Sequence, residues 1–319
     1  MKKVLIVDGY NLFIRHYAAH PAMSSNGEQI GGFVGFFYSV VNLIEKFKPS
    51  EVIVVWEGGG SSKKRSIDSN YKKGKRPQRL NRYYDREEIP DTLQNRDYQV
   101  KLIVKMFSFT PVKQVYVSDC EADDAIGFIC RYLRKDDIKL ILSSDHDFYQ
   151  LVDEKTRIWS PTLKSLVRTE DVIERYDIHP NNFCLAKAIV GDNSDNIQGV
   201  KGVGFKNLSK NYDKFIQPSD YDMDELFEDT RMKTQESKKK MFKNILVNET
   251  LIRRNWRLAY LDVQNVSHDQ IEKLKYKIEN SEKTFDKMGA MRLLLQQGIN
   301  NLHIDRGFIN FKLLRDAND

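Results

Sequence analysis

Four short apolar runs rich in β-branched residues punctuate the first half of the chain, and acidic side chains follow each of them. The runs occupy residues 4–7, 52–55, 115–117 and 140–142, with helix-like stretches between them. This alternation predicts an α/β fold with a mostly parallel central sheet flanked by helices, whose strands are buried on both faces. Because open parallel sheets bind ligands beyond the carboxyl ends of their strands, the acids there are the first candidates for function.

The second half of the chain has a different pattern. After Pro180 a helix is expected over residues 182–190, followed by a Gly-rich turn at residues 199–204 and charged amphipathic helices to about residue 297. We therefore expect an α/β domain over residues 1–185 and a helical, duplex-binding region over residues 186–319. The uncharged run at residues 30–44 is shorter than the roughly 20 residues that cross a bilayer, so we expect a core helix and no membrane association.

The three cysteines, Cys120, Cys130 and Cys184, indicate the compartment. They are odd in number and lack Cys-x-x-Cys spacing, which argues against a disulfide framework and against a zinc site. A reducing cytoplasm fits this pattern best.

Nine acids at or beyond the strand ends form the candidate metal site: Asp8, Glu57, Glu121, Asp123, Asp124, Asp145, Asp147, Asp192 and Asp195. Taken singly, each has an ordinary explanation, such as a helix cap, an Asx-turn or a solvated loop acid. Together they would repel one another and raise their own pKa values unless cations neutralised them. Oxygen ligands without a His or Cys cluster favour two Mg²⁺ ions, or Mn²⁺ in their place, and predict phosphodiester hydrolysis without a covalent intermediate.

A strongly basic segment separates the second and third runs. Residues 61–82 contain nine Lys and Arg residues and one acid, Asp68, whereas the whole chain has a net charge of +6. Tyr71, Tyr83 and Tyr84 lie in or beside this segment. Cations interleaved with aromatic residues are typical of surfaces that bind a nucleic-acid backbone and stack unpaired bases, although a solvated surface loop would have a similar composition.

Three acidic motifs occur in a familiar order: Glu-Ala-Asp-Asp-Ala-Ile-Gly at residues 121–127, Asp-His-Asp-Phe-Tyr-Gln-Leu at 145–151 and Gly-Asp-Asn-Ser-Asp-Asn-Ile-Gln-Gly-Val at 191–200. With the opening Val-Asp-Gly-Tyr-Asn-Leu-Phe-Ile-Arg at residues 7–15, they resemble the 5′-nuclease (flap endonuclease) family. That family includes the 5′-to-3′ exonuclease domain of bacterial DNA polymerase I and stand-alone phage enzymes of the ribonuclease H type. The resemblance extends from residue 4 to about residue 208 and implies a PIN-like fold with a helical arch and a helix-hairpin-helix-like motif.

The resemblance also implies a ligand set for each metal. Asp8, Glu57, Glu121, Asp123 and Asp124 would hold the tighter ion, and Asp145, Asp147, Asp192 and Asp195 would complete the second site. Two departures are visible in the sequence: Glu57 stands where the family usually has Asp, and Ser143-Ser144 replaces a common Thr-Gly pair. The extra methylene of Glu57 is expected to alter the spacing or the preference of the metals.

The basic segment matches the family's arch, at about residues 61–100. Lys64 or Arg65 would contact the scissile phosphate, and Tyr71-Lys72 matches a Tyr-Lys pair of the family that makes Lys72 a further catalytic candidate. The residues expected to bind nucleic acid from this half of the chain are Arg15, Tyr71, Lys73, Lys75, Arg76, Arg79, Arg82 and Tyr83. In the Gly-rich hairpin, Gly199, Lys201, Gly202, Gly204 and Lys206 would grip duplex phosphates beside a K⁺ held by backbone carbonyls, although an ordinary Gly-rich turn would also fit.

These features together predict a monomeric, structure-specific 5′-nuclease of a bacterial or phage-infected cytoplasm. Its substrates would be DNA with a 5′ flap or a free 5′ end and the RNA primer of an RNA–DNA hybrid, in replication or repair, with single-strand-binding or replication proteins as partners. One alternative is a catalytically weak nucleic-acid-binding protein whose metal geometry Glu57 has spoiled. Another is a PIN-type ribonuclease, although that class would lack both the Gly-rich hairpin and the basic arch.

Overall fold

The computed structural model describes residues 1–73, 82, 91–282 and 284–316. At its centre is a six-stranded sheet in the order β3-β2-β1-β4-β5-β6. The strands are β1 (Lys3–Asp8), β2 (Glu51–Trp56), β3 (Lys113–Tyr116), β4 (Ile138–Leu142), β5 (Thr156–Ser160) and β6 (Ser165–Val167). All neighbouring pairs are parallel except β5 and β6, which form an antiparallel hairpin at the edge. The prediction of a mostly parallel sheet is confirmed.

The central strands are buried on both faces, which explains their continuous apolar sequence. In β1, Val4 and Ile6 belong to one hydrophobic core, and Leu5 and Val7 belong to the other. Successive side chains of a strand point to opposite faces, so one short apolar run contributes to two cores at once.

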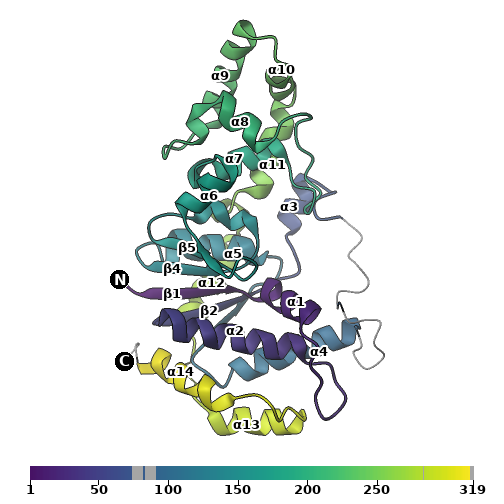
Figure 1. Ribbon diagram of the computed structural model, residues 1–319, viewed down its shortest axis with the longest axis vertical. Helices are drawn as coiled ribbons and strands as arrows, with labels where there is room; N and C mark the ends of the chain where they lie inside the picture. Colours follow the sequence, from purple (N-terminus) through teal and green to yellow (C-terminus); the bar gives the residue numbers. More distant parts are fainter. Residues whose placement is uncertain (74–81, 83–90, 283, 317–319) are drawn as a thin grey trace.

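Helices cover both faces of the sheet (Figure 1). On one face lie α1 (Gly9–Ala19), α2 (Gly31–Phe47) and α4 (Leu93–Phe107), and on the other lie α5 (Ala122–Phe128) and α6 (Thr169–Tyr176). The short helix α3 (Ser62–Ile67) stands beyond the carboxyl edge of the sheet, and the 3-10 helix η2 (His146–Leu151) follows β4.

A helical extension rises from the α5 side of the sheet (Figure 1). It consists of α7 (Pro180–Val190), α8 (Phe205–Asn211), α9 (Met223–Glu236), α10 (Lys240–Val247) and α11 (Glu249–Ala259). Pro180 occupies the first turn of α7, where its missing N–H costs no hydrogen bond, and His179 caps the helix by accepting from the Asn181 N–H. The expected boundary at residue 185 therefore falls inside a continuous helix.

The last three helices do not belong to this extension, which corrects the expected helical region of residues 186–319. They are α12 (His268–Glu279), α13 (Lys287–Gln296) and α14 (Ile304–Asp316). Helix α12 packs beside β3, and α14 packs on α2 at the opposite end of the molecule from α9 and α10 (Figure 1). Leu294, Phe308 and Phe311 are buried in the same core as Leu5 and Val7, because their apolar faces complete the outer layer over α2 and α4.

In the part of the chain that the structure describes, no helix combines the length and the apolar character needed to cross a membrane.

Candidate functional site

The carboxyl edge of the sheet gathers the acids that follow the strands. Asp8, the last residue of β1, lies beside Val55 of β2 in the sheet register. Its Oδ2 accepts a hydrogen bond from the Ser143 hydroxyl at 3.0 Å, and its Oδ1 accepts from the Asn11 N–H at 3.3 Å, which caps α1. Burial and the neighbouring Asp145 raise the pKa of Asp8 to about 7, so the site disfavours a further negative charge.

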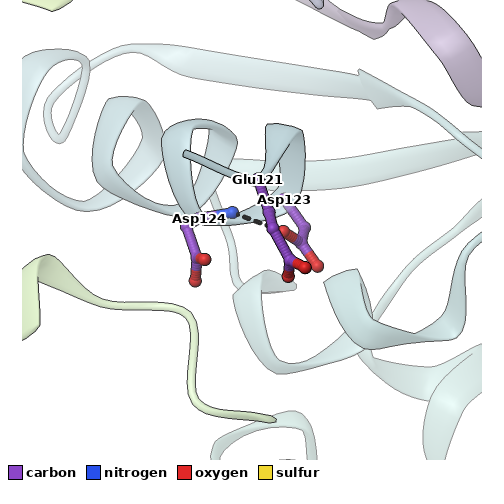
Figure 2. A group of neighbouring side chains, drawn as sticks. All are labelled: Glu121, Asp123 and Asp124. Carbon is purple, nitrogen blue, oxygen red and sulfur yellow. Dashed lines mark hydrogen bonds between the residues drawn. The ribbon is translucent and has the colours of Figure 1, made fainter. Parts of the chain in front are cut away.

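Glu121, Asp123 and Asp124 form a compact group at the start of α5, which we name the helix trio (Figure 2). One carboxylate oxygen from each lies within 4.8 Å of the others. Asp123 Oδ1 accepts from the Asp124 N–H at 2.8 Å, which fixes its carboxylate at the first turn of the helix. Glu121 is the N-cap of α5, with an extended backbone, and Asp123 and Asp124 lie in the first turn, so the three acids are close together along the chain.

Three side chains, one from α3 and two from the segment that follows it, surround Glu121. Lys64 Nζ, Lys72 Nζ and the Tyr71 hydroxyl lie 3.0, 3.0 and 2.9 Å from Glu121 Oε2. Lys64 Nζ is also 2.8 Å from Asp124 Oδ2. The basic segment therefore starts inside the acidic site.

Asp147, Asp192 and Asp195 form a second group, which we name the bridged trio, and its three oxygens also lie within 4.8 Å of one another. Asp147 belongs to η2, whereas the other two come from the loop after α7. Lys187 of α7 forms ion pairs with both Asp147 and Asp192, at 2.7 Å in the second case. Although burial opposes it, Lys187 lowers the pKa of Asp192 to about 2, and the acid stays charged.

Glu57 and Asp145 lie outside both trios but line the same hollow as Asp8, Asp123 and Lys72. Glu57 Oε2 accepts from the Ala122 N–H at 3.3 Å, at the start of α5. Asp145 Oδ1 accepts from the Asp147 N–H at 2.9 Å. Burial raises the pKa of each, and Asp123 adds to the rise. All nine acids expected from the sequence thus lie around one edge of the sheet.

The donor chemistry of the two trios fits divalent cations. Every candidate ligand is a carboxylate oxygen, the type of ligand that hard ions such as Mg²⁺ and Mn²⁺ prefer. Asp124 is fully buried, yet its Oδ1 accepts no hydrogen bond from the described residues. Lys64 Nζ lies beside the Oδ2 atom of this carboxylate, at 2.8 Å, which leaves the buried Oδ1 without a partner of its own. The helix trio therefore has an unused ligand atom, and the bridged trio has the same oxygen-only character.

The structure corrects the expected role of Lys64 and Arg65. Lys64 is 1% exposed and is held between Glu121 and Asp124, so a phosphate cannot reach its Nζ. Arg65 pairs instead with Asp119, which lies outside both trios, and its Nη2 is 3.5 Å from Asp119 Oδ1. Lys72, whose side chain is 36% exposed, lines the hollow together with the carboxylates. Of Lys64 and Lys72, the two lysines that contact Glu121, Lys72 is thus the one that a substrate can approach.

Tyr71 also differs from the expectation. Its ring is 4% exposed, and its hydroxyl donates to Glu121, so the ring is not available for stacking on an unpaired base. Burial and the nearby acids raise the pKa of the phenol, which keeps it a hydrogen-bond donor. Tyr71 therefore supports the Glu121 carboxylate in this structure.

The other expected nucleic-acid contacts fall into three groups. Arg15 and Arg82 line the hollow, and Lys73 is exposed beside Lys72. Four residues of the expected arch lie outside the described residues: Lys75, Arg76, Arg79 and Tyr83.

The Gly-rich turn between α7 and α8 forms the third group. Lys201, Gly202 and Lys206 are exposed there, and Gly202 adopts a positive φ of 79°. Gly204 caps α8. Gly199 has a structural reason instead, because a Cβ atom at this position would lie 1.9 Å from the carbonyl oxygen of Val190.

Lys187 was not predicted from the sequence, although a signal was present. It is the one charged residue among the apolar side chains of residues 183–190, and it is 7% exposed. A lysine on the buried part of a helix needs a carboxylate partner, and Asp192 follows it one turn later.

Known proteins resemble this chain in sequence. Residues 3–177 match the family model described as the 5′-3′ exonuclease, N-terminal resolvase-like domain. The 5′-3′ exonuclease of Aquifex aeolicus is 28% identical over 230 residues, which are 67% of this chain and 75% of that protein. The thermostable DNA polymerase I of Thermus filiformis is 29% identical over 206 residues, which are 64% of this chain and 23% of the polymerase.

Solved structures share the fold. T5 5′-exonuclease with divalent zinc ions bound has a TM-score of 0.66 at 22% identity and covers 88% of this chain and 99% of that one. The bacteriophage T5 D15 flap endonuclease, in a complex with DNA and metal ions, has a TM-score of 0.61 at 20% identity and covers both chains completely. The expected PIN-like nuclease architecture is confirmed by this likeness.

Proposed function

Since this chain belongs to the family of 5′-3′ exonuclease N-terminal, resolvase-like domains, we propose that it is a structure-specific 5′-nuclease that uses Mg²⁺ to cut DNA. Its substrates are duplexes with a 5′ flap or a free 5′ end, and RNA–DNA hybrids from which it removes RNA primers during replication or repair. The observation that carries this proposal is the pair of carboxylate trios at one edge of the sheet. They lie beside a hollow that a nucleic-acid strand can enter.

The two trios hold the metal ions in this proposal. Glu121, Asp123 and Asp124 bind one ion with Asp8 and Glu57 nearby, and Asp147, Asp192 and Asp195 bind the second with Asp145 nearby. When bound, such ions supply positive charge that eases the attack of water on a phosphodiester and stabilises the leaving 3′-oxygen.

The chain's own residues position the reaction. Lys72 Nζ faces the hollow beside Glu121 and Asp123, where it attracts the phosphate of an entering strand. The Tyr71 hydroxyl and the buried Lys64 ammonium both contact Glu121 Oε2 and hold the carboxylate in its orientation. Ser143 and the Asn11 N–H fix both oxygens of Asp8. These contacts hold the carboxylates before the substrate arrives, so little reorganisation is needed during the reaction.

Duplex binding is assigned to the turn between α7 and α8, in a helix-hairpin-helix-like arrangement. The exposed Lys201, Gly202 and Lys206 support this role, because cations and free backbone N–H groups suit duplex phosphates. Asp192 and Asp195 lie in the loop between α7 and this turn. A duplex held at the turn would therefore be fixed in register with the bridged trio. A K⁺ held by backbone carbonyls of the turn belongs to the same proposal.

Action in the cytoplasm of a bacterial or phage-infected cell fits the cysteines. All three are buried and unpaired. Burial raises the pKa of the Cys184 thiol, which makes it unreactive.

The binding-only alternative rests on Glu57. The structure gives this residue two backbone donors, the Gly60 N–H at 3.0 Å and the Ala122 N–H at 3.3 Å. Its carboxylate is thus fixed beside Asp123 despite the extra methylene, which favours the enzyme over the binding protein.

A cleavage assay tests the proposal. The full chain is incubated with a 5′-labelled flap duplex and with a 5′-labelled RNA–DNA hybrid, in Mg²⁺, in Mn²⁺ and in EDTA. We expect short labelled products only with a divalent ion, and none from Asp8→Ala. Junction binding without cleavage in either metal would support the binding-protein alternative and overturn the nuclease.

A further inference from the structure

The hollow that contains the catalytic carboxylates continues well beyond them. Its volume is about 990 Å³. From Asp8, Asp123 and Asp145 it follows α1 to a surface between α2 and the β5–β6 hairpin. The far part is lined by Ser39, Asn42 and Lys46 of α2, Trp159 of β5 and Lys164 of the hairpin turn, and we name it the α2–β5 groove. The proposed reaction does not use this groove.

A second hollow leaves the carboxylates in another direction. It measures about 470 Å³ and is lined by Lys187 and Phe183 of α7, the loop at Asp192, and Phe205 of α8. The two hollows share Asn11, Ser144 and Asp145. A nucleic-acid strand that crosses Asp145 can therefore run toward α7 and α8 in one direction and into the α2–β5 groove in the other.

The groove has the chemistry of a single-strand site. Apart from the four carboxylates at the site itself, the charged residues among those that line the larger hollow are cations. Lys46 and Lys164 are exposed, and Trp159 is half-buried. Lys46 Nζ lies 4.0 Å from the centroid of the Trp159 ring, so a cation and an aromatic ring are next to each other in the groove. Proteins that bind single strands without sequence preference combine such cations with an aromatic surface for stacking.

Hydrogen bonds hold the walls of the groove in place. Arg15 of α1 donates from Nη1 to the Thr162 hydroxyl at 2.8 Å and from Nη2 to the Pro161 carbonyl at 2.9 Å. The turn between β5 and β6 is thus tied to α1. On the α2 side, His16 and Ser39 are hydrogen-bonded at 2.7 Å. The walls are therefore formed before any ligand binds.

We propose that the α2–β5 groove binds the 5′ single strand of the substrate beyond the scissile phosphate, with phosphates at Lys46 and Lys164 and a base stacked at Trp159. This inference rests on the proposed function, in which the duplex lies on the α7–α8 side. Since the nucleotides removed by a 5′-nuclease lie on the 5′ side of the cut, they are the ones directed away from that duplex and into the groove. The enzyme thus prefers substrates whose 5′ single strand is long enough to fill the groove.

Binding measured in EDTA tests this proposal without cleavage. The full chain is titrated with a fluorescent duplex that has no tail, 5′ single-stranded tails of increasing length, or matched 3′ tails. For the wild type we expect affinity to rise with the length of the 5′ tail and then to level off. The double variant Lys46→Gln/Lys164→Gln should lose about tenfold of this gain and reduce the salt slope by about 1.4, roughly 0.7 for each lysine on a single strand. Its affinity for the untailed duplex should be unchanged.

Two further variants sharpen the test. Trp159→Leu keeps an apolar side chain in place and should also lose about tenfold of the 5′-tail gain, because a stacking surface is removed. Lys155→Gln, an exposed lysine at the other end of β5, is the matched control and should bind every duplex as the wild type does.

Several results would overturn the groove assignment. They are a 5′ tail that adds no affinity to the wild type, a gain that survives in both groove variants, and 3′ tails that bind as well as 5′ tails. Failure of the nuclease proposal would appear elsewhere, as the absence of products in the cleavage assay. The two failures are therefore distinguishable.

Discussion

The helix trio and the bridged trio have the same chemical groups but are assembled in different ways. Glu121, Asp123 and Asp124 come from one helical turn, whereas Asp147 is brought to Asp192 and Asp195 from a separate segment of the chain. Their cations also differ in origin. Lys64 and Lys72 reach the helix trio from the segment beyond β2, and Lys187 reaches the bridged trio from the helix that leads to Asp192.

This difference separates local from long-range requirements. The helix trio needs only the start of α5 in the right place, but the bridged trio needs η2, α7 and the following loop to pack together. Lys187 is nearly buried between two acids, whereas Lys72 is partly exposed. We therefore expect removal of Lys187 to affect folding, and removal of Lys72 to affect mainly catalysis.

The largest expected effects come from removing one ligand charge in each trio. Asp123→Asn and Asp192→Asn should each lower kcat by roughly 10²- to 10³-fold, because each removes a group that supports charge stabilisation in the transition state. Duplex affinity in EDTA should be kept or increased, since negative charge is lost. Steady-state cleavage of a 5′ flap and EDTA binding measure the two quantities.

The matched control for this pair is Asp119→Asn. Asp119 is a carboxylate outside both trios that accepts from the Ser62 N–H at 2.7 Å, and its loss should leave kcat within a few-fold of wild type. A kcat near wild type for either trio variant would remove that trio from the mechanism.

Lys72 and Arg65 of the basic segment should differ in effect, because Lys72 lines the hollow and Arg65 pairs with Asp119. Lys72→Ala should lower kcat/KM by roughly 10- to 100-fold, because it removes a charge that stabilises the phosphate. Arg65→Ala should change it by less than about threefold, because Arg65 is paired with Asp119 away from the hollow. If the Arg65 variant were the more impaired, the phosphate contact would belong to Arg65.

Lys187→Met should affect stability. Removing a nearly buried cation leaves Asp147 and Asp192 without their partner, and we expect a loss of about 3 kcal/mol in the free energy of unfolding in EDTA. Mg²⁺ should recover part of this loss by replacing the missing positive charge. Urea unfolding in EDTA and in Mg²⁺ checks both points, and a loss that Mg²⁺ does not change would contradict a metal at the bridged trio.

The smallest expected loss of stability comes from Glu51, a buried acid that belongs to neither trio. Although burial opposes it, hydrogen bonds from Arg134 and Lys113 lower the pKa of Glu51 below its ordinary value of 4.5. Because the folded-state pKa is lowered, this stabilisation is complete above pH 4.5 and disappears as the pH falls through the lowered value. Glu51→Gln should cost about 2 kcal/mol at neutral pH, since both partners are partly exposed.

Urea unfolding between pH 3 and pH 7 would show the difference between wild type and Glu51→Gln shrinking toward acid. Unlike the Lys187→Met difference, it should be equal in EDTA and in Mg²⁺. A Mg²⁺-dependent difference at Glu51 would mean that ion binding is coupled to Glu51 and not to the trios alone.

Much of the sheet and of the acidic site could be predicted because their causes are local. Continuous apolar runs such as residues 4–7 indicate buried parallel strands, and an acid directly after a strand must lie at its carboxyl edge. The three acids of the helix trio lie within four consecutive positions of the sequence, so their proximity could be expected. The membership of the bridged trio depended on the resemblance, because nothing near Asp147 in the sequence indicates its contact with Asp192.

The missed features depend on tertiary packing. A lysine-rich segment looks uniformly exposed in sequence, yet Lys64 is buried and Arg65, its neighbour, is not. Tyr71 was expected to stack on bases, and only its contact with Glu121 shows that it faces inward. Helices α12 to α14 have amphipathic patterns that any apolar surface could satisfy, so the pattern could not predict that α12 packs in one core of the α/β sheet and α13 and α14 in the other.

The most direct test of the central claim is a count of bound divalent ions. Calorimetric titration of the full chain with Mn²⁺ should give two sites. Asp124→Asn should remove or weaken one of them, Asp192→Asn should do the same to the other, and the control Asp119→Asn should keep both. Two unchanged sites in both trio variants, or no Mn²⁺ binding by the wild type, would contradict the account.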